Sequence, residues 1–133
     1  MLGKTHVAVG LATYVATTKS FHPAELAVVA ATSTLPDIDF HFGHRGVTHS
    51  LFALVLLAYI VKTTYPALLI PVLIGYGSHL ILDTLTPMGI PWLWPKNKRY
   101  KIPLVQTGST KESIIKYFAF LILVILAIKK AMG

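Results

Sequence analysis

Five apolar segments, separated by turns that contain proline, constrain the fold of this chain more than any other feature. Proline is tolerated in the first turn of a helix but not in its interior. The pairs His22-Pro23, Leu35-Pro36 and Tyr65-Pro66 therefore indicate where one helix ends and the next begins. Thr48 is the expected N-cap of the third helix. The expected helices are Gly3 to Thr18, Ala24 to Thr34, His49 to Thr64, Ala67 to Thr86 and Glu112 to Met132.

The composition indicates a membrane protein. Hydrophobic residues make up 54% of the 133 residues and charged residues 13%, values that are unusual for soluble proteins. We therefore expect an all-α, integral membrane helical bundle of four to five helices, folded as a single domain over residues 1–133. The net charge of +7 would suggest nucleic acid as the partner of a soluble protein, but here we assign it first to the membrane surface. The chain has no cysteine, which excludes disulfides and thiolate metal sites.

Acidic and imidazole side chains are concentrated in one stretch, Leu35 to Ser50. It reads LPDIDFHFGHRGVTHS and holds two of the three aspartates and three of the six histidines of the chain. The third aspartate, Asp83, follows His79 by four residues, so the two share one face of the fourth expected helix. Asp37 and Asp39 are expected on an extended loop, because proline disfavours a helix before it. Ionisable groups are costly in apolar surroundings unless they pair, bind a cation or take part in chemistry.

A topology of five spans brings these residues to one membrane face. If the N-terminal side is called side A, His6 lies on side A at the start of the first helix. The other candidates lie at helix ends on the same side, namely Asp37, Asp39, His44, His49, His79 and Asp83. Seven lysines and arginines fall on side A and four on side B, with Lys116 inside the last helix, which favours side A as cytoplasmic. The sequence therefore predicts one composite site near the cytoplasmic face of a multi-pass membrane protein.

These side chains suit a divalent metal. A catalytic Zn²⁺ has about three protein ligands, and the candidate residues offer four imidazoles and three carboxylates. We therefore expect two ions, or one ion with acid/base partners. Mixed nitrogen and oxygen ligands favour Zn²⁺, with Mn²⁺ or Fe²⁺ as alternatives. His44 could be a ligand or a general acid, Arg45 could hold a phosphate through two nitrogens, and His41 is either a ligand or a residue at the membrane interface. The expected metal ligands are His6, Asp37, Asp39, His49, His79 and Asp83.

Four motifs cover the chain from His6 to about Leu104. They are TH near the N-terminus, LPDID, HRGVTHSL, and GYGSHLILDTLTPMGIPWLWP followed by a basic stretch. Together they resemble the YdjM-like family of bacterial and archaeal inner-membrane proteins, which are described as metal-dependent hydrolases. PDID and HRxxTH are also similar, more distantly, to zinc-dependent phospholipase C-type proteins. The resemblance implies that the six expected ligands and His44 occupy motif positions of the family. The segment between PDID and HRG, only Phe40 to Gly43 here, is longer in many members.

The expected activity is hydrolysis of a phosphoester in a lipid or amphipathic substrate by water that the metal activates. Trp92 and Trp94, followed by the basic stretch Lys96–Lys101, are typical of a membrane interface in contact with anionic lipids. The oligomeric state stays open.

Two alternative functions stay open. A non-catalytic metal-binding or ion-transporting protein would need polar residues across the bilayer, and the third and fifth expected helices have few. A membrane anchor could recruit nucleic acid through the basic residues 96–111, but the sequence lacks a recognition-helix pattern, so nucleic acid is not an expected partner.

Overall fold

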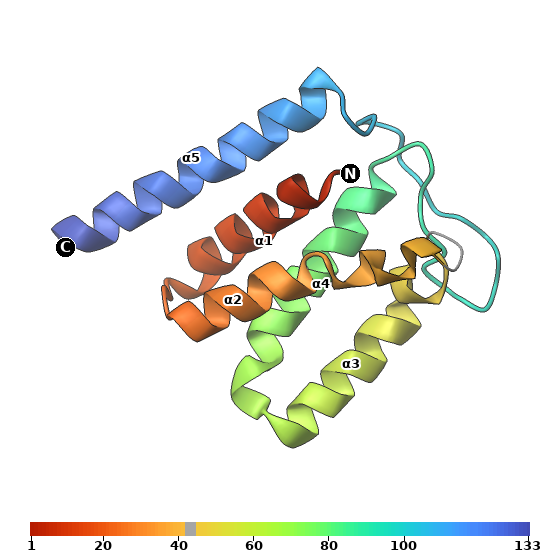
Figure 1. Ribbon diagram of the computed structural model, residues 1–133, viewed down its shortest axis with the longest axis horizontal. Coiled ribbons are helices and arrows are strands. Elements are labelled where there is room, and N and C mark those ends of the chain that lie inside the picture. Colours follow the sequence, from red (N-terminus) through yellow and green to blue (C-terminus); the bar gives the residue numbers. More distant parts are fainter. Residues whose placement is uncertain (42–44) are drawn as a thin grey trace.

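The computed structural model describes residues 1–41 and 45–133, without the side chains of residues 40 and 41. The described chain is all-α, as predicted, with loops between helices and no β-sheet (Figure 1). Three short 3₁₀-helices accompany the five α-helices. The elements are α1 (Gly3–Thr18), α2 (Pro23–Thr32), η1 (Leu35–His41), η2 (Val47–His49), α3 (Leu51–Thr64), η3 (Pro66–Leu68), α4 (Leu69–Thr84) and α5 (Thr110–Met132).

Helix α1 lies at the centre of the bundle and packs against α2, α4 and α5, whereas α3 packs mainly against α4 (Figure 1). Two glycines allow the inner helices to approach closely. Gly10 on α1 faces Ser33, and Gly75 on α4 faces Thr32, in each case too closely to leave space for a side chain. The C-terminal end of α2 is therefore held against α1 and α4, and η1 follows it directly.

The predicted boundaries are wrong at two places near the polar residues. Asp37 and Asp39 do not lie on an extended loop, because the 3₁₀-helix η1 begins at Leu35 and its early turn is closed by Asp37 N donating to Thr34 O at 3.1 Å. Proline fits this first turn, since it has no N–H to satisfy there. Thr48 is not the N-cap of α3, which begins at Leu51 with Ser50 as its N-cap.

The outer helices expose large apolar surfaces. Helix α3 has no buried residue, and α5 buries only Glu112 and Ala119. Among the described residues, one helical stretch, Pro66–Thr84, is long and apolar enough to cross a membrane. Helices α1 and α3 have 16 and 14 residues, fewer than the about 20 that span a bilayer. The multi-pass topology therefore stays a prediction.

Glu112 connects the start of α5 to the start of α1, a role that the sequence reading missed. Its side chain is 2% exposed. Oε1 accepts hydrogen bonds from Leu2 N at 2.6 Å and Thr5 Oγ1 at 2.7 Å, and Oε2 accepts one from Gly108 N at 2.6 Å. The available signal was the capping box, in which Ser109 is the N-cap of α5 and Glu112 follows three residues later.

Replacing Glu112 with glutamine should destabilise the fold by about 2 kcal/mol, because an amide group cannot accept all three hydrogen bonds. Burial raises the pKa of Glu112, but these hydrogen bonds outweigh it and place the pKa below the ordinary 4.5. The stabilisation is therefore present above pH 4.5 and is lost as the pH falls through the lowered pKa. Thermal unfolding of both proteins in one detergent, across pH, measures the difference. Glu25→Gln is the comparison: this partly exposed carboxylate near the start of α2 accepts hydrogen bonds from two hydroxyl groups, of Tyr14 and Ser20, so its replacement should cost less. An equal effect there would contradict the assignment.

Candidate metal centre

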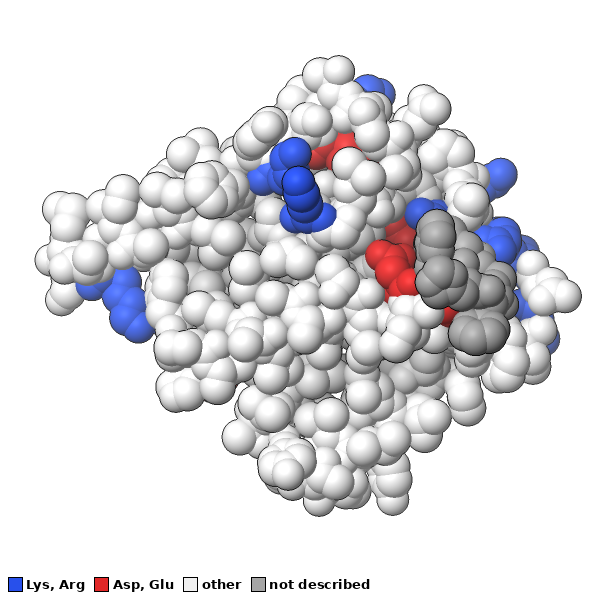
Figure 2. Space-filling view, viewed as in Figure 1, with Lys and Arg blue, Asp and Glu red and all other residues white. Residues whose placement is uncertain are grey.

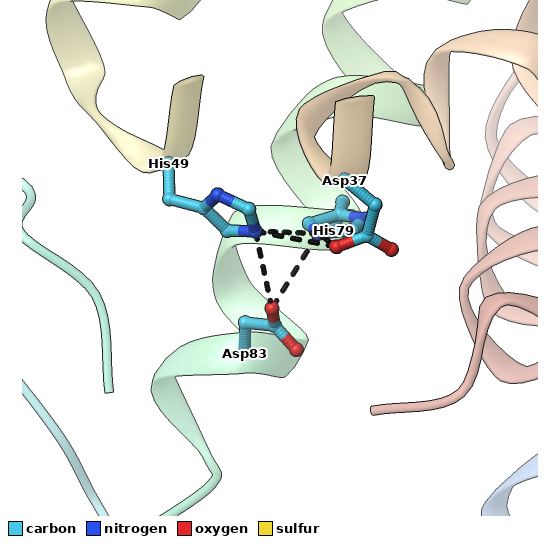
Figure 3. A group of neighbouring side chains, drawn as sticks. All are labelled: Asp37, His49, His79 and Asp83. Atoms are coloured by element: carbon cyan, nitrogen blue, oxygen red, sulfur yellow. Dashed lines mark hydrogen bonds and ion pairs between the residues drawn. The ribbon is translucent and has the colours of Figure 1, made fainter. Parts of the chain in front are cut away.

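Two histidines and two aspartates from three segments meet at one end of the bundle. Asp37 comes from η1, His49 from η2, and His79 and Asp83 from α4, and one ligand atom from each lies within 4.8 Å of the others. Figure 3 shows the four side chains pointing towards one another. His49, His79 and Asp83 are almost fully buried, whereas the side chain of Asp37 is 31% exposed. The predicted convergence of helix ends is confirmed for these four residues.

The spacing of these four atoms fits a tetrahedral metal ion. His49 Nε2 lies 3.2 Å from His79 Nε2 and 3.5 Å from Asp37 Oδ1, and Asp37 Oδ1 lies 3.6 Å from His79 Nε2. Asp83 Oδ2 lies 3.4 Å from both Nε2 atoms. Ligands at 2.0–2.1 Å from a shared tetrahedral centre lie roughly 3.3–3.4 Å apart. These five distances scatter around that value, so the four donor atoms could hold a tetrahedral metal ion.

A hydrogen bond at Nδ1 of His79 leaves the lone pair of Nε2 pointing towards the other three donor atoms. His79 Nδ1 lies 2.7 Å from the carbonyl oxygen of Ser33, which can only accept, so Nδ1 carries the proton. In the neutral ring Nε2 then presents a lone pair towards His49 Nε2 and two carboxylates. Four electron-rich atoms at van der Waals distance repel one another unless a cation or a proton lies among them. Either a proton on His49 or a divalent cation, whose charge would balance the two carboxylates, would relieve this repulsion.

The histidines and aspartates of this group shift one another's pKa values. Burial lowers the pKa of His49, but the carboxylates of Asp37 and Asp83 outweigh it, so the pKa of His49 lies above its ordinary 6.5. Burial raises the pKa of Asp37, but the imidazoles of His49, His79 and His6 outweigh it and the pKa is lowered. A proton on His49 competes with a metal for the same atom, because metal ligands must be deprotonated.

Asp39, an expected ligand, lies outside this four-atom group. Its Oδ2 accepts hydrogen bonds from Thr48 Oγ1 at 2.5 Å and Gly46 N at 3.0 Å, and lies 3.7 Å from His49 Nδ1. On the side of His49 that faces away from the other three ligands, Nδ1 lies 3.3 Å from Thr48 Oγ1, and this hydroxyl group in turn binds Asp39. Metal-binding histidines commonly have a carboxylate in this place, where it fixes the ring orientation and raises ligand basicity.

Asp39→Asn should weaken metal binding about 10- to 100-fold without changing the number of ions bound, the usual cost of losing a carboxylate behind a ligating histidine. A competition titration with a zinc-sensitive chelator measures the affinity, and elemental analysis measures the stoichiometry. Loss of the metal at saturating concentration would instead identify Asp39 as a ligand.

Three groups surround the other oxygen of Asp83. Oδ1 lies 3.3 Å from His6 Nε2, 3.1 Å from Arg45 Nη2 and 2.5 Å from the amino group of Met1. The ring of His6 stacks on His79 at 3.7 Å between centroids, and both of its nitrogens are buried without a hydrogen-bond partner. His6 thus lies beside the four-atom group, and its role as a ligand stays a prediction. His44 and the side chain of His41 lie outside the described residues.

Arg45 joins the loop before η2 to the end of α4. It adopts a left-handed backbone conformation with φ of 63° and is 4% exposed. Nη1 donates to Thr86 Oγ1 at 2.7 Å and to Gly89 O at 3.3 Å, and Nε is buried without a partner. Arg45 also lines a cavity of about 420 Å³ with Met1, Thr86, Met88 and Gln106. This cavity therefore offers space for a ligand next to Arg45, which contacts Asp83.

The expected membrane-interface residues lie in the segment between α4 and α5. Trp92 is half-buried and its Nε1 donates to Thr84 Oγ1 at 2.8 Å, whereas Trp94 is 38% exposed. Lys96, Lys98 and Lys101 are exposed in the same segment. Figure 2 shows that acidic side chains reach the surface near this basic end of the molecule. Contact of this segment with lipids stays a prediction.

Comparison with known proteins places the chain among membrane proteins. A family model described as "YdjM inner membrane protein" matches residues 1–132. The chain is 34% identical over 139 residues to the uncharacterized protein YvsG of Bacillus subtilis (strain 168), an alignment that covers 86% of this chain and 87% of YvsG. It is 41% identical over 83 residues to the inner membrane protein YdjM of Escherichia coli (strain K12), covering 56% of this chain and 42% of that protein. No solved structure matches significantly.

Proposed function

We propose that this chain, which belongs to the YdjM inner membrane protein family, is a membrane-embedded zinc hydrolase that cleaves a phosphoester of a lipid or amphipathic substrate. The observation that carries the proposal is the set of four donor atoms, which are spaced as the ligands of a tetrahedral metal ion. Zn²⁺ fits two imidazoles and two carboxylates better than Mg²⁺ or Ca²⁺, which prefer oxygen ligands.

Asp37, His49, His79 and Asp83 would hold the ion. When bound, Zn²⁺ supplies a Lewis acid that lowers the pKa of water and stabilises negative charge on a phosphoryl oxygen. The side chain of Asp37 is 31% exposed, so water and substrate would approach from its side. A second ion is predicted from the number of candidate ligands and would need His6 or residues outside the described part of the chain.

Arg45 would orient the phosphoryl group. Its guanidinium is fixed by Asp83, Thr86 and Gly89, and it lines the cavity of about 420 Å³ described above. A planar guanidinium can donate two parallel hydrogen bonds to one phosphate, which positions the substrate more firmly than an ammonium group does. The exposed apolar faces of α3 and α5 would keep the protein at the membrane, where an amphipathic substrate is concentrated.

The proposal is tested by turnover of a panel of phosphatidic acid, phosphatidylglycerol and phosphatidylcholine in mixed micelles. We expect zinc-loaded protein to release phosphate or a phosphorylated headgroup from at least one of them, chelation to stop the release and zinc to restore it. Arg45→Lys should lower kcat/KM about tenfold or more while zinc stays bound. Arg99→Lys is the matched control, because Arg99 also donates to Gly89 O, at 3.5 Å, but contacts no ligand residue.

A non-catalytic metal-binding protein is the second candidate. It is favoured by the number of protein ligands, since four ligands close a zinc site and catalytic sites usually have three. Stoichiometric zinc without turnover of any substrate in the panel would support this function and contradict the hydrolase. Ion transport is less favoured, because the interior beyond Gly10 is the apolar cluster of Tyr14, Val15 and Val29, which offers an ion no strong ligands.

A further inference from the structure

A second surface feature lies at the opposite end of the bundle, where α1 ends, the chain turns into α2, and α5 terminates (Figure 1). It is a groove of about 370 Å³, which we call the lysine groove. Along α1, about 20 Å separate it from His6, at 1.5 Å per residue. The groove is lined by Val15, Lys19, Phe21, Leu126, Lys129 and Lys130.

The rim of the lysine groove carries three positive charges. Lys19 follows the last turn of α1, and Lys129 and Lys130 lie in the last turn of α5. The groove is lined by no carboxylate. Figure 2 shows a group of basic side chains at this end of the molecule, apart from the acidic residues. The glutamate at this end, Glu25, already accepts hydrogen bonds from Tyr14 and Ser20.

The floor of the lysine groove is apolar. Val15 is 1% exposed, and Phe21 and Leu126 are partly buried against the cluster that Val15 forms with Tyr14 and Val29. Lys130 Nζ lies 5.0 Å from the centre of the Phe21 ring, so a cation is held directly above the apolar surface. The apolar surface next to the groove continues along α5 through Leu123, which lies about one turn before Leu126 and packs against the same cluster.

We infer that the lysine groove binds one anionic phospholipid, with the phosphate among Lys19, Lys129 and Lys130 and the start of an acyl chain on Phe21 and Leu126. Basic side chains at a membrane surface attract anionic lipids, and the apolar floor formed by Phe21 and Leu126 extends along α5 to Leu123, which offers a surface for the start of an acyl chain. A soluble anion would use only the rim, and a neutral lipid would use only the floor. An anionic phospholipid uses both. The inference does not rest on the proposed hydrolase activity.

Native mass spectrometry of the full chain in detergent, titrated with phosphatidylglycerol or phosphatidylcholine, tests this inference. We expect phosphatidylglycerol to bind more tightly, and the double variant Lys129→Gln/Lys130→Gln to lose this preference, with affinity for phosphatidylglycerol reduced about tenfold or more. The control Lys4→Gln/Lys62→Gln removes the same charge from two exposed positions outside the lysine groove, at the start of α1 and in the last turn of α3, and should bind as wild type does. An equal loss in the control would mean general electrostatic attraction and would overturn the site.

A second pair of variants tests the floor while all lysines remain. Leu126→Gln places a polar group in the groove and should weaken phosphatidylglycerol binding, whereas Ile125→Gln, at a neighbouring position that is 52% exposed and outside the groove, should not. Equal affinity in both variants would show that no acyl chain occupies the floor. Full competition by glycerol 1-phosphate at the concentration of the lipid would identify a site for a soluble anion instead. Either result overturns the assignment.

Discussion

Replacement of His79 by alanine is expected to remove the metal from the purified protein and any metal-dependent turnover with it. His79 Nε2 lies at 3.2 to 3.6 Å from the other three donor atoms, so its loss takes away one of four ligands and leaves a buried gap. Loss of a residue that only supports a metal ligand lowers the affinity up to roughly 100-fold. Loss of the ligand His79 itself should lower the affinity for zinc by more than that. Elemental analysis after dialysis against a weak chelator gives the metal content, with at least one equivalent expected for wild type.

The control for this experiment is His22→Ala. His22 is exposed at the start of α2, at the opposite end of the bundle, and makes no side-chain capping bond to the helix. It should retain the full metal content. If His79→Ala kept its metal, or if His22→Ala lost it equally, the four-atom group would not be the metal site. Asp37→Ala is a third variant that separates loss of a ligand from loss of packing, because it removes the most exposed ligand with the least disturbance of the packed interior.

A methyl group at Gly75 is expected to destabilise the bundle by about 2 kcal/mol or more, although alanine is the better helix former. A Cβ at this position would lie 2.1 Å from Thr32 Oγ1 and 2.7 Å from the carbonyl oxygen of Val29, so α2 has to move away from α4. Gly77→Ala is the matched control two residues along α4. A Cβ there meets nothing within 4 Å, so this change should be neutral or stabilise by up to about 1 kcal/mol.

The same pair of variants tests whether helix packing positions the metal ligands. Asp37 lies in η1, directly after α2, whereas His79 and Asp83 lie on α4. A displacement of α2 from α4 should therefore weaken zinc binding in Gly75→Ala, while Gly77→Ala should bind zinc as wild type does. Thermal unfolding and a chelator competition on the same preparations measure both effects. An unchanged affinity in a clearly destabilised Gly75→Ala protein would show that η1 holds Asp37 independently of α2.

The helices themselves could be predicted from the sequence with small errors, because proline limits where a helix can begin and apolar residues fill the segments between the prolines. The errors fall where short polar segments fold by contacts within the loop. Thr48 has the residue type of an N-cap, but its hydroxyl group bonds instead to Pro36 O and to Asp39. A sequence pattern cannot rank such competing partners, since they lie 9 and 12 residues away along the chain.

The role of Glu112 was hidden for a similar reason. Its place in a capping box predicts a local bond at the start of α5, but its carboxylate also accepts hydrogen bonds from Leu2 and Thr5, more than 100 residues away. Only the packing of α5 against α1 brings these donors to it.

The sequence by itself determined that four polar helix ends meet, because consecutive helices joined by short turns return to the same end of a bundle. The tertiary structure alone decided which atoms face a shared centre. Asp37 and Asp39 are two residues apart, and on a 3₁₀-helix with three residues per turn they point about 120° apart rather than to opposite sides. Asp37 therefore faces His79 and Asp83, and Asp39 contacts the far nitrogen of His49. Metal coordination depends on differences of less than 1 Å, which long-range packing sets and residue spacing does not.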